Sequence, residues 1–300
     1  MKRDIISILD VEDEIDEIID YAIKNKNVKT DLLKGKNFAL IFEKQSTRTR
    51  VSFEVAINQM GGNSIYITPS NSQLGRGENI EDTAKVLSRF ADGIIYRTYS
   101  NKDLIKMANN AEIPVINALD DKEHPCQILA DLMTIKEKKG ILSGLKLAYV
   151  GDGNNVANSL MLGAALTKMN FAIATPKGYE PSQDIIENAK RIANDNSTEL
   201  IITDDPIESV KDADIIYTDV WISMGDENET EKRKNVFKNY QINQELVKYA
   251  KKDYIFMHCL PAHRNLEVTS EIIDGKHSVV FDEAENRLHA QKALLNKIFK

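Results

Sequence analysis

Residues 42–54, FEKQSTRTRVSFE, group the hydroxyl and guanidinium side chains that a phosphate requires. An apolar stretch ends there and a helix is expected to begin, with four polar groups in succession: Ser46, Thr47, Arg48 and Thr49. The backbone N–H groups and the positive dipole end of that helix would meet the same anion. An ordinary helix cap, with Ser46 accepting a first-turn N–H, is the alternative. A cap needs only one such group, so we interpret the segment as a phosphate site.

A second motif, EHPCQILADL at residues 123–132, also lies where a loop gives way to a helix. Pro125 suits a first helical turn, which places His124 beside the helix N-terminus and Gln127 on the same side. An imidazole in this position can donate a hydrogen bond to a carbonyl oxygen that becomes negative. A single histidine is more often structural, so this interpretation depends on the other motifs.

Two further motifs follow predicted strands, at the edge where open α/β sheets bind ligands. In FMHCLPAHR, residues 256–264, the residues in this position are Cys259 and Leu260. Zinc on His258, Cys259 and His263 is a weak alternative, because no second ligand pair accompanies them. We therefore expect no metal.

The other motif, TDVWISMG at residues 218–225, ends a predicted strand at Asp219 and begins a loop at Ser223 and Met224. The Asp219 carboxylate could pair with a substrate ammonium group. The alternative is an aspartate that caps a turn at the end of the strand.

The glycine-rich YVGDGNNVANSL, residues 149–160, superficially indicates dinucleotide binding after a strand. However, Val156 occupies the third glycine position, and the next strand offers no acid for a ribose hydroxyl. A nicotinamide enzyme is therefore disfavoured. Asn154 and Asn155 are instead placed to hold a substrate carboxylate or amide.

From residue 37 onward, short β-branched runs alternate with longer amphipathic runs, which predicts successive βα units and parallel sheets. The first half has predicted strands at 38–42, 64–67, 93–97 and 114–117, and helices at 47–60, 80–90, 102–110 and 125–138. A hinge is expected over 136–144, with a domain boundary near residue 140. The second half has predicted strands at 145–150, 171–175, 199–203, 214–219, 254–258 and 278–281. Charge-rich residues 225–239 predict an exposed, mobile loop, and residues 284–299 predict a terminal helix.

Composition restricts the class of protein. The chain has 300 residues, 42% of them hydrophobic and 28% charged, which suits two globular α/β domains. A net charge of −7 argues against a nucleic-acid partner. The sequence shows neither a signal peptide nor an apolar run long enough to span a membrane, and two distant cysteines predict no disulfide framework. We therefore expect a cytoplasmic protein.

The motifs STRTR, HPCQ, DVWISMG and HCLPAHR, with ENRLH near the end, together resemble the aspartate/ornithine carbamoyltransferase family over residues 46–287. The SMG sequence at residues 223–225 resembles the corresponding loop of the ornithine branch of this family. The resemblance implies two α/β domains, each with a central parallel sheet flanked by helices, facing an active-site cleft. Residues 1–140 would bind carbamoyl phosphate, with helix 284–300 packing back on them, and residues 141–283 would bind L-ornithine. The products would be L-citrulline and phosphate, within arginine metabolism, without a cofactor.

The resemblance also implies a role for each matching residue. The phosphate would be held by Ser46, Thr47, Arg48 and Thr49, and the carbamoyl group by Arg97, His124 and Gln127. Gln73 would complete that site across a subunit interface of a homotrimer. Ornithine would contact Asn155, Asp219, Ser223 and Met224, while Cys259, Leu260 and Arg287 would line the junction of both ligands. The implied catalytic residues are Thr49, Arg97, His124 and Cys259.

Three alternatives remain at the level of sequence. A relative that uses putrescine would not need Asp219 together with the Ser223 and Met224 loop, because putrescine has no α-amino or α-carboxyl group. A relative specific for aspartate should carry positive charge where Asp219 stands. A non-catalytic binding protein would not need the intact STRTR motif, His124 and Arg287.

Overall fold

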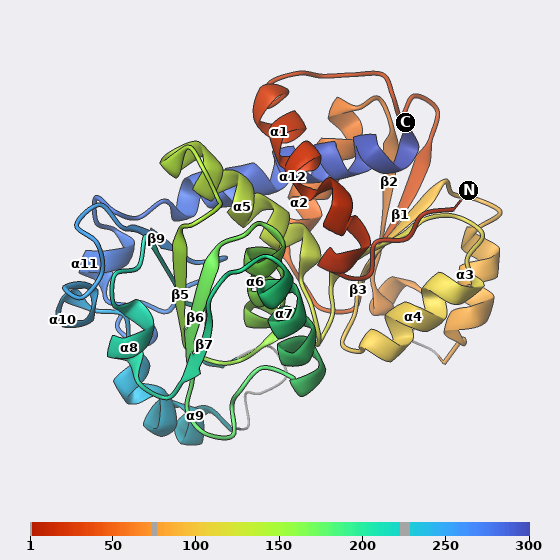
Figure 1. The fold of residues 1–300 in the computed structure, drawn as a ribbon. Coiled ribbons are helices and arrows are strands. Elements are labelled where there is room, and N and C mark those ends of the chain that lie inside the picture. Colours follow the sequence, from red (N-terminus) through yellow and green to blue (C-terminus); the bar gives the residue numbers. More distant parts are fainter. Residues whose placement is uncertain (1, 74–76, 223–228) are drawn as a thin grey trace. The chain divides into compact units, whose positions relative to one another are not determined.

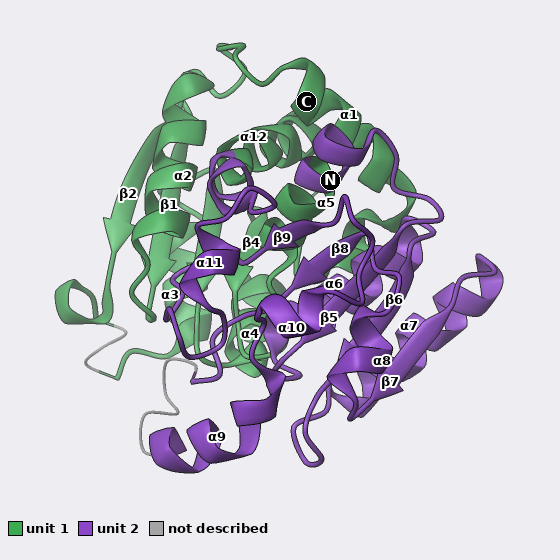
Figure 2. Cartoon of the chain, turned by 90° about the vertical axis from the view of Figure 1, so that its left-hand side faces the viewer, with its two compact units in different colours: residues 1–133, 286–300 green, residues 134–285 purple. Residues whose placement is uncertain are grey.

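The chain forms two compact units in a computed structural model, which describes residues 2–73, 77–222 and 229–300. Unit 1 comprises residues 1–133 and 286–300, and unit 2 comprises residues 134–285 (Figure 2). The boundary between them falls within two helices, α5 and α12. Each unit has its own parallel sheet flanked by helices (Figure 1), so the predicted fold class is confirmed.

Unit 1 is built on a four-stranded sheet in the order β2-β1-β3-β4, with every neighbouring pair parallel. The strands are β1 (Asn37–Phe42), β2 (Asn63–Ile67), β3 (Gly93–Arg97) and β4 (Val115–Leu119). The helical elements are η1 (Ile8–Glu14), α1 (Ile15–Lys24), α2 (Thr47–Gln59), η2 (Pro69–Asn71), α3 (Ile80–Leu87), α4 (Asn101–Asn110) and α5 (Pro125–Lys139). The strand order reverses between β1 and β3, and this is the position where open α/β sheets bind ligands.

Unit 2 is built on a five-stranded parallel sheet in the order β7-β6-β5-β8-β9, which reverses between β5 and β8. The strands are β5 (Lys146–Val150), β6 (Asn170–Ala174), β7 (Leu200–Thr203), β8 (Ile215–Tyr217) and β9 (Ile255–Met257). The helical elements are α6 (Asn155–Leu166), α7 (Gln183–Asp195), α8 (Pro206–Val210), α9 (Thr230–Phe237), η5 (Lys238–Tyr240), α10 (Gln244–Val247), α11 (Ser270–Ile273) and α12 (Val280–Phe299).

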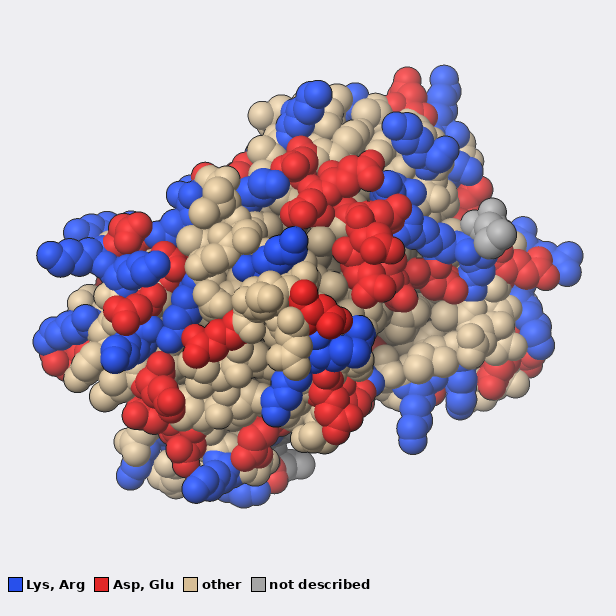
Figure 3. Space-filling view, in the orientation of Figure 1, with Lys and Arg blue, Asp and Glu red and all other residues tan. Residues whose placement is uncertain are grey.

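The N-terminal segment, for which no element was predicted, forms η1 and α1. The acids of α1 are exposed, whereas Ile15, Ile18 and Ile19 are buried, so α1 is an amphipathic helix. In Figure 3 acidic side chains gather over these two elements: Asp10, Glu12, Asp13, Asp16, Glu17 and Asp20. Elsewhere on that face, lysines and arginines are interspersed with acids.

Two predictions about the second half were wrong. Residues 278–281 form no strand, since Ser278 makes only an isolated bridge to Phe256 and α12 begins at Val280. Val279 and Val280 are buried in the core. A short β-branched run can be buried in this way at the start of a helix as well as in a strand, so the run alone does not distinguish the two. In unit 1, the far end of α12 packs Phe299 on the ring of Phe38 in β1, with centroids 5.1 Å apart.

Residues 230–240 are helical, although an exposed, mobile loop was predicted over 225–239. Phe237 is fully buried in α9, packed 5.8 Å from Trp221 and 4.9 Å from Tyr179, centroid to centroid. Phe237, together with the buried Tyr240, thus anchors a segment whose other residues are exposed or half-buried. Among the described residues, no helix is both long and apolar enough to span a membrane.

Candidate active site

The phosphate motif lies on the first turn of α2, directly after the carboxyl end of β1. Ser46 is the N-cap, and its Oγ accepts a hydrogen bond from the Thr49 N–H at 3.2 Å. Ser46 therefore has the capping role that was considered as the alternative, while its hydroxyl proton can still be donated to an anion. The first turn contains no acid, so the positive end of the helix dipole is not offset locally.

Two buried arginines converge on the Thr49 hydroxyl within unit 1. Arg97 ends β3 and donates from Nη1 to Thr49 Oγ1 at 3.5 Å, and Arg287 of α12 donates from Nη2 at 2.5 Å. Thr49 is fully buried, and the arginines are 5% and 3% exposed. Burying two cations in a protein costs several kcal/mol each unless negative charge compensates. Guanidinium groups beside the start of a helix also suit an anionic ligand at the sheet's reversal point.

His124 precedes α5 and is 4% exposed. Burial holds the pKa of its imidazole well below the usual value, and the nearby charges of Arg287 and Arg97 lower it further. The ring is therefore neutral at neutral pH, with one nitrogen able to donate and the other able to accept. A neutral donor suits a carbonyl oxygen that gains charge during a reaction.

This low pKa predicts a pH-dependent contribution of His124 to stability. The unfolded histidine binds a proton below about pH 6.5, whereas the folded one resists it, so the free energy of unfolding falls as pH drops below 6.5. We expect His124→Gln to remove this loss, of up to about 1.4 kcal/mol per pH unit, in urea unfolding between pH 7.5 and 5.5. The exposed His263→Gln serves as control. Parallel pH curves for wild type and His124→Gln would contradict the prediction.

The remaining predicted residues of unit 1 occupy different positions. Gln127 is fully buried in the first turn of α5, where its backbone N–H donates to the His124 carbonyl at 3.0 Å. Gln73 has an exposed side chain, and its carbonyl accepts from the Glu78 N–H. No described contact of Gln73 joins it to the Thr49 cluster.

The last arginine of STRTR faces away from this cluster. Arg50 donates to Glu54 one turn further along α2, at 3.0 Å, and its guanidinium carbon lies 3.7 Å from the ring centroid of Tyr66. Its side chain is 42% exposed. The motif therefore divides its two arginines between a half-buried position at Arg48 and a surface ion pair at Arg50.

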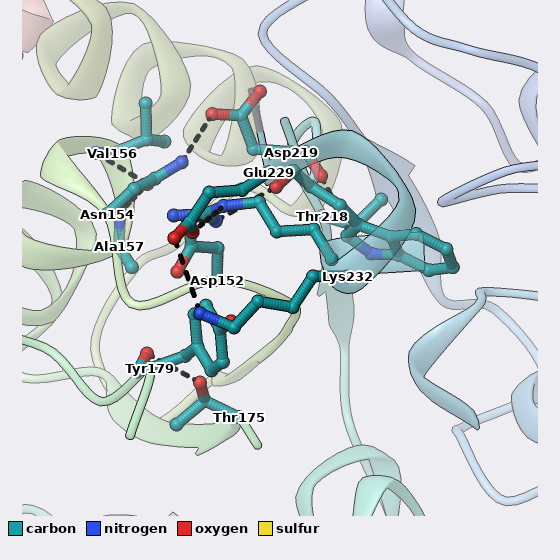
Figure 4. Close-up of polar contacts among 12 residues, drawn as sticks. Asp152, Asn154, Val156, Ala157, Thr175, Tyr179, Thr218, Asp219, Glu229 and Lys232 are labelled. Atoms are coloured by element: carbon teal, nitrogen blue, oxygen red, sulfur yellow. Dashed lines mark hydrogen bonds and ion pairs between the residues drawn. The ribbon is translucent and has the colours of Figure 1, made fainter. Parts of the chain in front are cut away.

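In unit 2 the predicted residues lie after β5, β8 and β9, at the carboxyl edge of the sheet. Asn154 caps α6 by accepting from the backbone N–H groups of Val156 and Ala157. Its amide nitrogen donates to Asp219 Oδ2 at 2.9 Å (Figure 4). Asn155, which was selected from the sequence, is the first residue of α6 and half-buried. The sequence indicated both asparagines, but the contact of Asn154 with Asp219 depends on a strand order that sequence spacing does not reveal.

Asp219 is 6% exposed and accepts a second hydrogen bond, from the Cys259 thiol, at 3.1 Å between Oδ1 and Sγ. The carboxylate is therefore oriented from both sides. Leu260 follows with a φ of 57°, which is unfavourable for a residue with a Cβ atom. Its N–H donates to His258 Nδ1 at 2.9 Å, which stabilises this turn.

Asp219, His258 and Cys259 bring potential metal ligands within 4.8 Å of one another. However, His258 Nδ1 accepts from Leu260, and its Nε2 lies 3.3 Å from Glu267 Oε1. A metal on His258 would have to replace one of these contacts. His263, the third ligand in the zinc alternative, has a side chain that is 56% exposed and is not in this cluster.

Ser223 and Met224 lie outside the described residues. The segment that follows them is fixed by Arg233 of α9, whose Nη1 donates to Asp152 Oδ2 at 2.7 Å and to the Trp221 carbonyl at 3.0 Å. The Arg233 and Asp152 side chains are each 11% exposed, and Tyr179 lies beside the guanidinium, 5.1 Å from ring centroid to Cζ. Both ends of the described chain around 223–228 are thereby attached near the loop that follows β5.

Comparison with known proteins agrees with this arrangement of residues. Residues 3–137 match the family model described as aspartate/ornithine carbamoyltransferase, carbamoyl-P binding domain, and residues 143–298 match its Asp/Orn binding domain. The chain belongs to the aspartate/ornithine carbamoyltransferase family. It is therefore an enzyme that transfers carbamoyl groups.

Several relatives within the carbamoyltransferase family cover essentially the whole chain. A catabolic ornithine carbamoyltransferase of Thermoplasma volcanium is 57% identical over 300 residues, which cover 99% of this chain and 98% of that protein. The solved ornithine carbamoyltransferase of Pyrococcus furiosus is 51% identical with a TM-score of 0.95, covering 99% of this chain and 97% of that one. The solved anabolic enzyme of Campylobacter jejuni is 40% identical, also with a TM-score of 0.95, and covers 99% of each chain.

Proposed function

We propose that this carbamoyltransferase transfers the carbamoyl group of carbamoyl phosphate to the side-chain amine of L-ornithine, giving L-citrulline and phosphate. The main structural support is the pair of buried arginines, Arg97 and Arg287, which meet at Thr49 on the capped end of α2. The names of the relatives from Thermoplasma volcanium and Pyrococcus furiosus support ornithine as the acceptor.

Phosphate binding is proposed for the first turn of α2. The hydroxyls of Ser46, Thr47 and Thr49 and the guanidinium of Arg48 would supply donors to its oxygens, together with backbone N–H groups. These donors also stabilise the leaving group, because the phosphate gains negative charge when the bond between carbon and the bridging oxygen breaks.

The neutral ornithine amine would attack the carbamoyl carbon and form the new carbon–nitrogen bond. Negative charge then develops on the carbonyl oxygen, where Arg97, His124 and the Thr49 hydroxyl are proposed as donors. Collapse of this intermediate expels phosphate, and the proton lost by the attacking nitrogen passes to a phosphate oxygen. No enzyme-bound covalent intermediate is needed, so Cys259 is assigned a positioning role, in agreement with its hydrogen bond to Asp219.

Unit 2 is the proposed amino-acid half-site. The Asp219 carboxylate, already oriented by Asn154 and Cys259, would pair with the α-ammonium group of ornithine. The resemblance further assigns Asn155, Ser223 and Met224 to ornithine, and Leu260 and Arg287 to the reacting groups. Much of the rate would come from positioning two bound reactants, for which no cofactor is required.

A homotrimer in the cytoplasm is the proposed form of the enzyme. The exposed side chain of Gln73 is consistent with a role in a neighbouring subunit's carbamoyl phosphate site. The relatives include enzymes named catabolic in Thermoplasma and anabolic in Campylobacter. We therefore propose a role in arginine metabolism and assign the reaction to neither the catabolic nor the anabolic direction.

A citrulline assay with a panel of amines tests the acceptor. We expect carbamoyl phosphate to react with ornithine and hardly with putrescine, because putrescine offers no α-ammonium group to Asp219. Aspartate should be inactive for the opposite reason, since its second carboxylate would approach the Asp219 carboxylate. Faster use of putrescine would favour the alternative amine, and inactivity with every amine would favour a non-catalytic binding protein.

A further inference from the structure

Two of the polar side chains that helix α5 buries lie one turn apart, and the resemblance assigns only the first of them, Gln127, to the carbamoyl group. Gln127 and Asp131 are both fully buried in unit 1. The Gln127 amide nitrogen, Nε2, donates to Asp131 Oδ1 at 2.8 Å. Placing a carboxylate in the interior is costly, whereas on a helix surface such a pair stabilises the helix only slightly. This cost suggests that Asp131 has a task besides stabilising the helix.

The contact with Asp131 determines which end of the Gln127 amide faces the ligand. A carboxylate oxygen accepts hydrogen bonds, so the amide must turn its NH₂ group toward Asp131. Rotating the amide by half a turn would place its oxygen against the carboxylate oxygen. The Gln127 carbonyl oxygen, Oε1, therefore points away from Asp131 as an acceptor.

A carbamoyl group needs such an acceptor. Its carbonyl oxygen suits the donors Arg97, His124 and Thr49, whereas its NH₂ group has two protons to donate, for which a guanidinium group offers no acceptor. The backbone N–H of Gln127 donates to the His124 carbonyl, so the two residues lie on the same helical turn. His124 in turn lies close enough to Arg97 and Arg287 for both charges to lower the pKa of its imidazole. Gln127 is thus positioned to complement the NH₂ end of the carbamoyl group.

We propose that Asp131 is a positioning residue that holds the Gln127 oxygen toward the carbamoyl NH₂ group, and so makes unit 1 selective for carbamoyl over acyl phosphates. This inference depends on the proposed function, because it assumes that carbamoyl phosphate binds at the Thr49 cluster. Acetyl phosphate carries a methyl group in place of NH₂ and so has no proton to donate to the Gln127 oxygen.

Two stable phosphonates test this selectivity by calorimetry on the full-length enzyme. Phosphonoacetamide has the NH₂ group, 2-oxopropylphosphonate has a methyl group in its place, and inorganic phosphate measures the anion site alone. We expect wild type to bind the amide about tenfold more tightly than the ketone, the effect of one buried hydrogen bond. In Asp131→Asn the amide of Gln127 can face either way, so the two affinities should become equal. The affinity for phosphate should change less than twofold.

A matched control comes from an equivalent pair on the surface of α7. Gln183 Nε2 donates to Glu187 Oε1 at 3.0 Å, also four residues apart, and both side chains face water. Glu187→Gln should leave the selectivity for the amide unchanged. Retained selectivity in Asp131→Asn would overturn the inference, as would an equal loss for all three ligands, which indicates a folding role.

A double exchange provides a second test if Asp131→Asn does not fold. In Gln127→Glu combined with Asp131→Asn, the new asparagine donates to the new carboxylate, whose other oxygen still accepts from the ligand's NH₂ group. Volume and total charge are conserved, and we expect the preference for the amide to persist at about tenfold. Equal affinities in this variant would contradict the inference.

The wild-type measurements separate this inference from the proposed function. If wild type binds no phosphonate and no phosphate, the proposed function itself fails. If wild type binds both phosphonates equally, only the proposed selectivity fails.

Discussion

Arg97→Met is expected to lower the kcat of citrulline formation by about 10²–10³-fold, the usual effect of removing one donor from an oxyanion site. Methionine preserves much of the volume of the arginine stem but has no N–H group. Arg97 is 5% exposed and already donates to Thr49, so its guanidinium is held in place before a ligand binds. A donor held in this way stabilises developing charge without reorganisation during the reaction.

Arg50→Met provides the control for this experiment within the same unit. Arg50 pairs with Glu54 on the surface of α2, and exposed pairs contribute at most about 1 kcal/mol to stability. We expect its kcat to remain within a factor of two or three. Equal losses of kcat in Arg97→Met and Arg50→Met would indicate that activity responds to the loss of any positive charge in unit 1. That result would refute an oxyanion role for Arg97.

The elements around the active site could be predicted because their signals are local. Ser46 caps α2 and Pro125 begins α5, as their side-chain chemistry indicates. The buried strands also carry β-branched or aromatic runs, so the phosphate motif and Cys259 were placed correctly after strands. These features depend only on neighbours in the sequence.

Other features depend on contacts between distant parts of the chain. The helical conformation of α9 depends on the packing of Phe237 with Trp221 and Tyr179, which periodicity in a charged segment does not reveal. Likewise, Asn154 reaches Asp219 only because β5 and β8 are neighbours in the sheet. Asp131 has the spacing of an ordinary helical pair, and only its complete burial distinguishes it from Glu187.

Asp219→Asn is expected to lower kcat/KM for ornithine by about 10²-fold or more, with little effect on the affinity for phosphonoacetamide. Losing one partner of a buried, hydrogen-bonded charge pair costs about 2–5 kcal/mol, and tenfold corresponds to 1.4 kcal/mol. The substitution preserves shape and can still accept from Asn154 or Cys259. The loss therefore reports the charge that Asp219 would offer to the α-ammonium group.

Asp214→Asn is the matched control, because the two aspartates flank the same strand, β8, with nearly equal burial. Asp214 is 5% exposed and precedes β8, where it pairs with Lys251 at 2.8 Å, whereas Asp219 is 6% exposed and follows the strand. Ligands of parallel sheets bind at the carboxyl end, so Asp214→Asn should lower the free energy of unfolding without raising the KM for ornithine. If both variants lose ornithine use in proportion to their lost stability, Asp219 has only a folding role. A selective loss in Asp219→Asn, with phosphonoacetamide still bound normally, would instead assign the carboxyl edge of the second sheet to the amino acid.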